Sequence, residues 1–301
     1  GRGPAWANSL FEDNAEFGYG MSVSMRTRRE GIKTVVERLA KNPAFGGVAN
    51  AWLKNRNNSD ANHLGEALVE LCKVYPENED AQFVIKNADL LGKPSMWIFG
   101  GDGWAYDIGY GGLDHILASR ENFNVLVFDT EVYSNTGGQS SKATPTGAVA
   151  QFAAGGKPTG KKDLAQIAMT SGHVYVAQVA MGANPAQIIA YAPCINHGLK
   201  AGMNRSMPEM KKAVRAGYWN LLRFDPRLAE EGKNPLQIDS AKPNEDYQTF
   251  LKGEVRYASL SMKNPDHAAS LFAESEKNAL DRYDSLIQRR NSLEPKEGLA
   301  K

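Results

Sequence analysis

The stretch Met96-Trp-Ile-Phe-Gly-Gly-Asp-Gly103 joins a short apolar run to a Gly-Asp-Gly turn, and a second polar cluster, Thr130-Glu-Val-Tyr-Ser-Asn135, follows later. Residues 93–100 and 124–129 are predicted to be buried parallel strands, and residues 106–120 are predicted to be the helix between them. In open α/β sheets, ligands bind beyond the carboxyl ends of the strands. The sequence therefore predicts a βαβ unit whose two polar clusters meet at one ligand site.

The residue types in these clusters suit a diphosphate held through a divalent metal ion. Mg²⁺ prefers octahedral oxygen ligands and commonly binds through one or two carboxylates together with substrate phosphates. Asp102 supplies a carboxylate, Thr130 a hydroxyl and Val132 a main-chain carbonyl. Gly101 and Gly103 have no Cβ, so the backbone can approach the phosphate oxygens closely. The spacing of the two clusters fits the thiamine diphosphate motif.

Five blocks of the chain carry a resemblance to a known family. These blocks are Gly3–Gly18, Gly100–Tyr110, Asp129–Gln139, Tyr191–Gly198 and Gly217–Pro235. Together they resemble the C-terminal part of the pyruvate:ferredoxin (flavodoxin) oxidoreductases, almost from end to end.

The resemblance implies the function of a larger enzyme. It implies oxidative decarboxylation of pyruvate to acetyl-CoA and CO₂, with coenzyme A as acceptor and with electrons passed through iron–sulfur clusters to ferredoxin or flavodoxin. In that family an N-terminal domain of the same protein holds the aminopyrimidine of thiamine diphosphate. This chain would then bind only the diphosphate–Mg²⁺ end, would be inactive alone, and would work in a full-length homodimer.

The resemblance also assigns roles to single residues. It makes Asn135 a catalytic and cofactor-binding side chain, with stabilisation of the local turn as the alternative. Trp104 and Ala105 would pack on the diphosphate side, although Trp104 could simply fill the core. Cys194 would complete a [4Fe-4S] cluster, which needs four thiolates, and the family's other three ligands lie upstream of this chain. Cys72, on a predicted amphipathic helix, is interpreted as a small buried hydrophobic residue.

Composition excludes several classes of protein. The 301 residues include 35 basic and 34 acidic side chains, a net charge of +1, which favours neither nucleic acid nor a membrane surface as partner. No apolar stretch approaches the roughly 18–20 residues that cross a bilayer, and residues 1–21 lack the apolar core of a signal peptide. Two cysteines do not make a disulfide framework and suit a reducing, cytoplasmic location.

The pattern of helix and turn signals predicts three parts. Residues 1–92 are an N-terminal lead and helical segment, in which residues 1–29 are expected to be extended or loop-like. Residues 93–223 form the α/β diphosphate-binding core, and residues 224–301 a polar C-terminal extension with a last amphipathic helix over 268–288. The predicted fold class is therefore α/β: a parallel-sheet thiamine-diphosphate-binding fold with helices on both faces, plus the helical lead and the polar tail.

One connection is unusually short. Residues 173–179 and 187–192 are both predicted strands, and only residues 182–186 lie between Met181 and the second strand. Two parallel neighbouring strands need a crossover of about a dozen residues or more. Either the second segment is not a strand in the usual place, or the crossover helix of the family is missing here. Further on, residues 199–223 are expected to form a basic helix pair broken at Pro208.

Two other functions stay open. A non-catalytic interaction module is supported by the short crossover and the missing cysteines, and is opposed by the intact set Asp102, Thr130 and Asn135. An oxidoreductase for another 2-oxo acid, such as 2-oxoglutarate, is compatible with everything above. Ser134 is interpreted as a cofactor-loop residue rather than part of a hydrolase triad, and His197 as a residue engaged in local hydrogen bonding.

Overall fold

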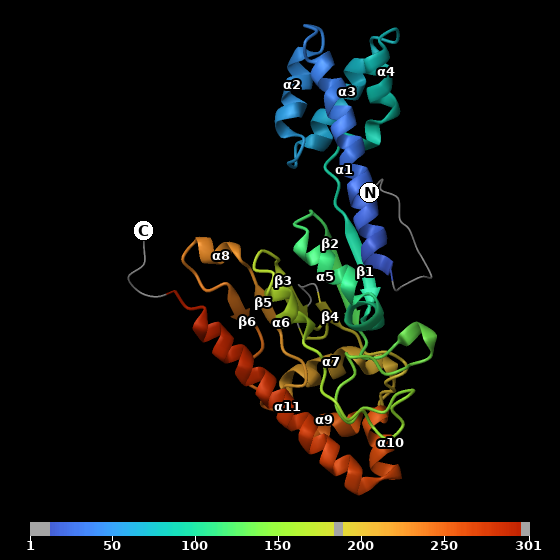
Figure 1. Ribbon diagram of the computed structural model, residues 1–301, viewed down its shortest axis with the longest axis vertical. Helices are drawn as coiled ribbons and strands as arrows, with labels where there is room; N and C mark the ends of the chain where they lie inside the picture. The colour runs from blue at the N-terminus through green and yellow to red at the C-terminus, as the bar shows by residue number, and fades with distance from the viewer. Residues whose placement is uncertain (1–12, 184–188, 296–301) are drawn as a thin grey trace. The chain divides into compact units, whose positions relative to one another are not determined.

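The computed structural model describes residues 13–183 and 189–295, which fall into two compact units (Figure 1). The first, the helical unit, comprises residues 16–97 and 121–124. The second, the sheet unit, comprises residues 13–15, 98–120 and the described residues from 125 onward.

The helical unit is built on amphipathic helices. Its elements are α1 (Asn14–Leu39), α2 (Gly46–Asn55), α3 (Ala61–Lys73), α4 (Glu79–Lys86) and a 3₁₀ turn at Ala88–Leu90. Helical spacing brings apolar side chains onto one face of each helix, and these faces meet in a core that includes Ile32, Val36, Phe45, Trp52, Leu68, Cys72 and Val84. Trp52 Nε1 satisfies its hydrogen-bonding need by donating to the Leu91 carbonyl at 2.9 Å.

Residues 1–29 were predicted to be extended or loop-like. This prediction is wrong from Asn14 onward, because α1 begins there. Ala15, Ser22, Arg29 and Ile32 are buried and recur at helical spacing. Most of this face is made of small or charged side chains instead of aliphatic ones, so it carried no apolar signal. Residues 1–12 lie outside the described part of the chain.

The sheet has six strands in the order β1-β2-β4-β3-β5-β6. Their bounds are β1 Trp97–Gly101, β2 Asn124–Asp129, β3 Val176–Val179, β4 Ile189–Tyr191, β5 Leu222–Phe224 and β6 Leu236–Ile238. β4 pairs in parallel with both β2 and β3, whereas β5 pairs antiparallel with β3 and with β6. The α/β fold class is thus confirmed, with an antiparallel edge that the sequence did not predict.

The βαβ unit around the Gly-Asp-Gly turn is present with changed bounds. β2 has the predicted limits, and β1 begins four residues later than predicted. A single helix over 106–120 was a wrong prediction, because a π-helix at Gly103–Ile108 comes before α5 (Tyr110–Ala118). π-helical turns are rare and are frequent at functional sites.

β4 is a strand of the sheet, and it lies between β2 and β3. Residues 180–188 are the entire connection between the parallel neighbours β3 and β4. This connection is shorter than the usual crossover. Residues 184–188 lie outside the described ranges, so the predicted strand is seen only from Ile189.

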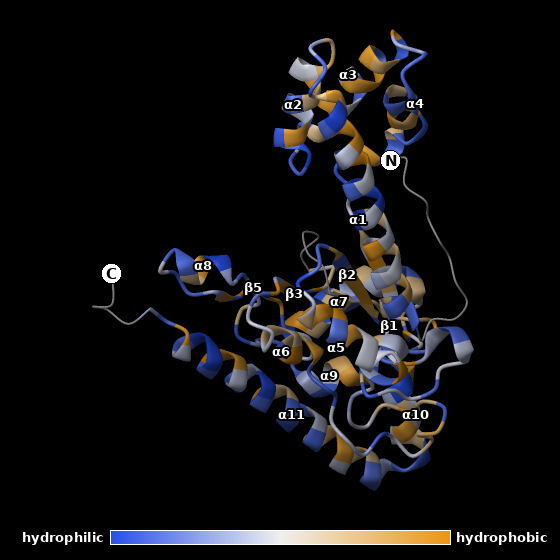
Figure 2. Ribbon diagram, turned by 45° about the horizontal axis from the view of Figure 1, so that its top comes forward, coloured by the Kyte–Doolittle hydropathy of each residue, from blue (hydrophilic) through white to orange (hydrophobic). Residues whose placement is uncertain are grey.

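The C-terminal residues belong to the sheet unit. They form α8 (Arg227–Glu230), α9 (Tyr247–Gly253), α10 (Val255–Lys263) and α11 (Pro265–Ser292), which includes the predicted last helix. Hydrophobic turns alternate with hydrophilic ones along α11 (Figure 2). The apolar side chains of α9–α11, such as Tyr257 and Phe272, share one core with residues between 148 and 221, such as Tyr191 and Trp219.

The expected helix pair over 199–223 is wrong. One α-helix, α7 (Ser206–Arg215), follows a 3₁₀ turn at Met203–Arg205, and β5 takes up the end of the segment. Pro208 lies in the first turn of α7, where a missing N–H costs no hydrogen bond. Another short helix, α6 (Leu164–Met169), precedes β3. In the described ranges, no helix is long and apolar enough to cross a bilayer.

Candidate cofactor site

Three oxygen atoms predicted as metal ligands converge beyond the ends of β1 and β2. Thr130 Oγ1 lies 2.7 Å from Asp102 Oδ1 and 3.0 Å from the main-chain oxygen of Val132. Adjacent ligands in an octahedron with Mg–O bonds near 2.1 Å lie about 3.0 Å apart. The separations therefore match those of neighbouring ligands around one small cation.

Two serines complete the shell around these oxygens. Ser141 Oγ donates to Asp102 Oδ2 at 2.6 Å, and Ser134 Oγ lies 2.6 Å from Thr130 Oγ1. Ser141 is itself held by Lys157, whose ammonium donates to the Ser141 carbonyl at 2.8 Å. Residues 134–141 were expected to form a loop around the cofactor, but the contact of Ser141 with Asp102 was not predicted, since nothing in the local pattern links Ser141 to a turn 39 residues earlier.

The Asp102 carboxylate is the main electrostatic feature of the site. Its residue is 1% exposed. Burial, and secondly the nearby charge of Asp129, raise its pKa to about 7, against the opposing hydrogen bonds from Ser141 and Thr130. Within the described ranges, Asp102 forms no ion pair with a cationic side chain. The same ranges contain no cluster of three or more Asp, Glu, His or Cys residues that could hold a metal ion. A buried carboxylate surrounded by neutral oxygens fits a bound cation, which would supply the missing positive charge.

The glycines around Asp102 have different surroundings. A Cβ on Gly103 would lie 2.4 Å from the ring of Tyr133, and one on Gly100 would lie 2.2 Å from the ring of Trp104. Both positions therefore need glycine for packing. A Cβ on Gly101 would meet nothing within 4 Å, so this is the position whose backbone stays open to a ligand.

The residues after the Gly-Asp-Gly turn are in the core. Trp104 and Ala105 are fully buried in the π-helix, and the Trp104 ring packs on Gly100. Asn135 lies in a 3₁₀ turn, Ser134–Thr136, with its side chain exposed. Gly137, which ends this turn, has φ 113°, a left-handed conformation that favours glycine.

His197 takes part in the site through the backbone. Its buried ring contacts the Thr130 carbonyl through Nε2, and its Nδ1 accepts from the Cys194 amide at 3.4 Å. Burial, reinforced by the charge of Arg256, lowers the His197 pKa to about 3, so this ring is neutral at physiological pH. The expected local hydrogen bonding of His197 is confirmed by its contact with Cys194, and its contact with Thr130, a predicted metal ligand, was not expected.

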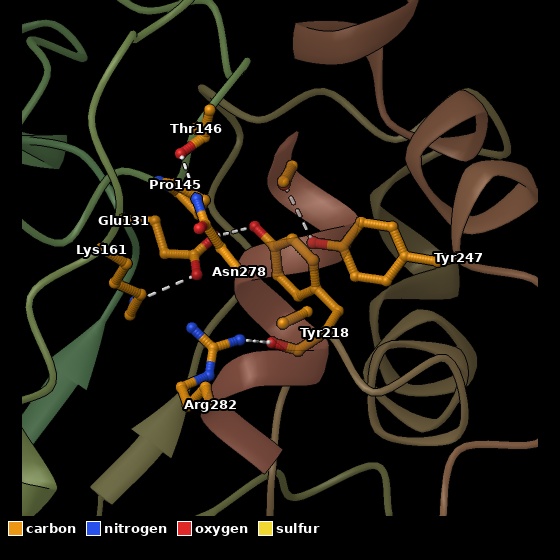
Figure 3. A pocket seen from close by; sticks show the side chains of 10 residues that line it. Glu131, Pro145, Thr146, Lys161, Tyr218, Tyr247, Asn278 and Arg282 are labelled. Carbon is orange, nitrogen blue, oxygen red and sulfur yellow. Dashed lines mark hydrogen bonds and ion pairs between the residues drawn. The ribbon is translucent and has the colours of Figure 1, made fainter. Parts of the chain in front are cut away.

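A chain of buried charges lies next to the ligand loop, residues 130–132. Lys161 Nζ pairs with Asp129 at 2.8 Å and with Glu131 at 3.0 Å; Figure 3 shows the second pair. Arg256 in turn lies 2.7 Å from both Glu131 and Glu254. These five alternating charges connect the end of β2 to α10.

The two cysteines differ in accessibility. Cys194 follows β4 and is half-buried, with Asn196 Nδ2 3.6 Å from its sulfur. Cys72 is fully buried in the core of the helical unit, as expected for a small hydrophobic residue, and burial raises the pKa of its thiol to about 11.

This difference in accessibility predicts which of the two cysteines a thiol reagent labels. Because the thiolate is the reactive species, iodoacetamide at pH 8 should modify Cys194 and leave Cys72 unmodified in the native chain, whereas both should react in urea. Peptide mass spectrometry reads out each site. Equal labelling rates for both thiols without urea would contradict the buried position of Cys72.

Comparison with known proteins identifies the domain that carries this site. Residues 85–198 match the family described as "Thiamine pyrophosphate enzyme, C-terminal TPP binding domain". These residues are similar to the C-terminal domain of thiamine pyrophosphate enzymes. The cluster of Asp102, Thr130 and Val132 lies inside the matched residues.

Relatives with assigned activities are similar over almost the whole chain. It is 50% identical to the pyruvate:ferredoxin oxidoreductase of Moorella thermoacetica over 96% of its own length and 27% of the relative's. It is 50% identical to a Klebsiella pneumoniae pyruvate-flavodoxin oxidoreductase (94% of this chain, 26% of the relative), and 44% identical to the Euglena gracilis mitochondrial pyruvate dehydrogenase [NADP(+)] (94% and 17%). The resemblance to these oxidoreductases is thus confirmed.

The chain spans about a quarter of the length of the first two relatives. The alignment with the Moorella thermoacetica protein runs over 317 positions, more than the 301 residues of this chain, so that relative has residues with no counterpart here.

Proposed function

We propose that this chain binds the diphosphate end of thiamine diphosphate through Mg²⁺, as part of an oxidoreductase that decarboxylates pyruvate. The observation that carries the proposal is the convergence of Asp102 Oδ1, Thr130 Oγ1 and the Val132 carbonyl oxygen at 2.7–3.0 Å. The similarity to pyruvate oxidoreductases supports the reaction and the substrate.

Each of these residues has a separate task in the proposal. Asp102 provides the anionic ligand, while Thr130 and Val132 provide neutral oxygens that fix the cation's position. The open backbone at Gly101 leaves space for a phosphate oxygen. When bound, thiamine diphosphate supplies the carbanion that adds to the ketone and the electron sink for decarboxylation. The exposed amide of Asn135 would donate a hydrogen bond to a substrate oxygen or to the cofactor.

The remaining parts of the proposal follow the relatives. Coenzyme A would accept the acetyl group, and ferredoxin or flavodoxin would accept electrons. Cys194 would contribute one thiolate to a [4Fe-4S] cluster, whose three other ligands would come from outside this chain. A further domain would hold the aminopyrimidine, and the working enzyme would be a cytoplasmic homodimer.

The proposal is tested by calorimetric titration of the 301-residue chain. Thiamine diphosphate should bind in the presence of Mg²⁺ and should not bind in EDTA, because the cation joins two negatively charged groups. Thiamine, which lacks the diphosphate, is the matched control ligand and should not bind. Binding of thiamine with the affinity of thiamine diphosphate would contradict a site for the diphosphate end.

Two alternatives have some support. The short connection between β3 and β4 favours a non-catalytic interaction module, which would show no Mg²⁺-dependent binding of the cofactor. Another 2-oxo acid as substrate would leave the titration unchanged, and turnover of the complete enzyme with 2-oxoglutarate instead of pyruvate would reveal it.

A further inference from the structure

Glu131 stands between the two metal-ligand residues of the loop and has an unusual backbone. Its φ is 59°, in the left-handed region that residues with a side chain seldom adopt. A left-handed residue turns the chain back on itself, and here the Thr130 hydroxyl and the Val132 carbonyl come within 3.0 Å of each other. The spacing of two proposed ligands therefore depends on this one residue.

The side chain of Glu131 is fully buried and is held on several sides. Its Oε2 accepts from the Tyr218 hydroxyl at 2.5 Å and from Arg256 at 2.7 Å, and its Oε1 accepts from Lys161 at 3.0 Å. Figure 3 shows the contacts with Tyr218 and Lys161. Burial raises the pKa of this carboxyl, but the charges of Lys161 and Arg256 outweigh burial and lower it to about 2. The carboxylate is ionised and paired with two cations.

The main chain of Glu131 is fixed as well. The Thr144 hydroxyl donates to its carbonyl, and the Lys157 ammonium donates to the Thr144 carbonyl at 2.6 Å. Strained conformations persist only when the surrounding structure over-determines them. The contacts of Glu131 meet this condition, since they come from segments far apart in the sequence.

Glu131 and two of its partners, Tyr218 and Lys161, line a small cavity on the side facing α11. The cavity has a volume of about 20 Å³, and Asn278 and Arg282 of α11 form part of its wall (Figure 3). Arg282 donates to the Tyr218 carbonyl at 2.9 Å. The C-terminal helix thus supports the residue that anchors Glu131.

We propose that Glu131 is a positioning residue: its anchored carboxylate holds the left-handed turn that sets the spacing of the Thr130 and Val132 oxygens, and thereby favours Mg²⁺ over larger cations. This role rests on the proposed function. Mg²⁺ requires ligands at 2.0–2.1 Å in near-ideal octahedral geometry, whereas Ca²⁺ accepts 2.3–2.6 Å and irregular geometry. A loop free to move would lose more affinity for Mg²⁺ than for Ca²⁺.

The test measures both ions in the 301-residue chain. Mg²⁺ and Ca²⁺ are titrated separately at a fixed concentration of thiamine diphosphate, and the ratio of the two dissociation constants is compared between variants. Glu131→Gly keeps the left-handed backbone accessible and removes the anchor. We expect it to weaken Mg²⁺ binding by about 10- to 100-fold, the usual effect of losing a group that orients metal ligands, and to weaken Ca²⁺ binding less.

Two further variants separate positioning from general stability. Tyr218→Phe removes one hydrogen bond to Glu131 and should shift the ratio in the same direction by a smaller factor; it decides the question if Glu131→Gly does not fold. Tyr247→Phe is the matched control: it removes the buried hydrogen bond to Ser275 in place of one to Glu131, and should keep the wild-type ratio.

The outcomes are distinguishable. An unchanged ratio in Glu131→Gly and Tyr218→Phe, or an equal loss for both ions, would overturn the positioning role and leave the proposed function intact. Failure of the wild-type chain to bind thiamine diphosphate with either ion would overturn the proposed function and the positioning role together.

Discussion

Asp102→Ala is expected to lower the Mg²⁺-dependent affinity for thiamine diphosphate by about 100-fold or more. Asp102 is the one carboxylate among the converging oxygens, and without it the cation is held by neutral ligands only. Mg²⁺ bound to proteins relies on one or two carboxylates beside the phosphates. Calorimetric titration of the 301-residue chain with the cofactor and Mg²⁺ measures the loss.

The fold should tolerate this substitution. The Asp102 carboxylate is buried without an opposite charge, so its removal takes away a group that is costly in the absence of a cation. The thermal unfolding midpoint of the cofactor-free variant should therefore equal or exceed that of the wild type.

Three other variants rank the contributions of single side chains to cofactor binding. Asp102→Asn keeps the shape and removes the charge, and should bind almost as weakly as Asp102→Ala. Thr130→Val should lose less, because water can replace a neutral hydroxyl in the octahedron. Asn135→Ala should spare cofactor binding, since its exposed side chain is not among the converging oxygens, and should depress turnover in the complete enzyme. An Asp102→Ala chain with unchanged affinity would refute the assignment of the site.

Local sequence patterns predicted the parts of the site that depend on strand ends. The apolar runs before Asp102 and Thr130 marked two strands, and the strand-end rule then placed the two side chains together. The hydroxyl and carboxylate chemistry pointed to a metal-bound diphosphate before any distance was known. Residues 124–129 form a strand with the predicted limits for the same reason.

Long-range pairing is what the sequence could not predict. Glu131 reaches Arg256 across 125 positions and Tyr218 across 87, and no local pattern links such residues. The left-handed backbone of Glu131 was equally hidden, because glycine is the residue that ordinarily indicates positive φ. The first half of α1 escaped notice for a different reason, since Ser22 and Arg29 occupy its buried face in place of aliphatic residues.

Removal of the Arg256 side chain is expected to destabilise the sheet unit. Arg256 is 3% exposed and pairs with Glu131 and Glu254, each at 2.7 Å. Arg256→Ala would leave two buried carboxylates with fewer cationic partners, and breaking a buried ion pair from one side costs about 3–5 kcal/mol. Urea denaturation followed by hydrogen exchange of peptides from the sheet unit measures the change in the free energy of unfolding separately from the helical unit. Arg215→Ala, which breaks the exposed pair with Glu245, is the matched control and should cost less than about 1 kcal/mol. If both variants unfolded at the same urea concentration as the wild type, the buried charges behind the ligand loop would not be part of what holds it in place.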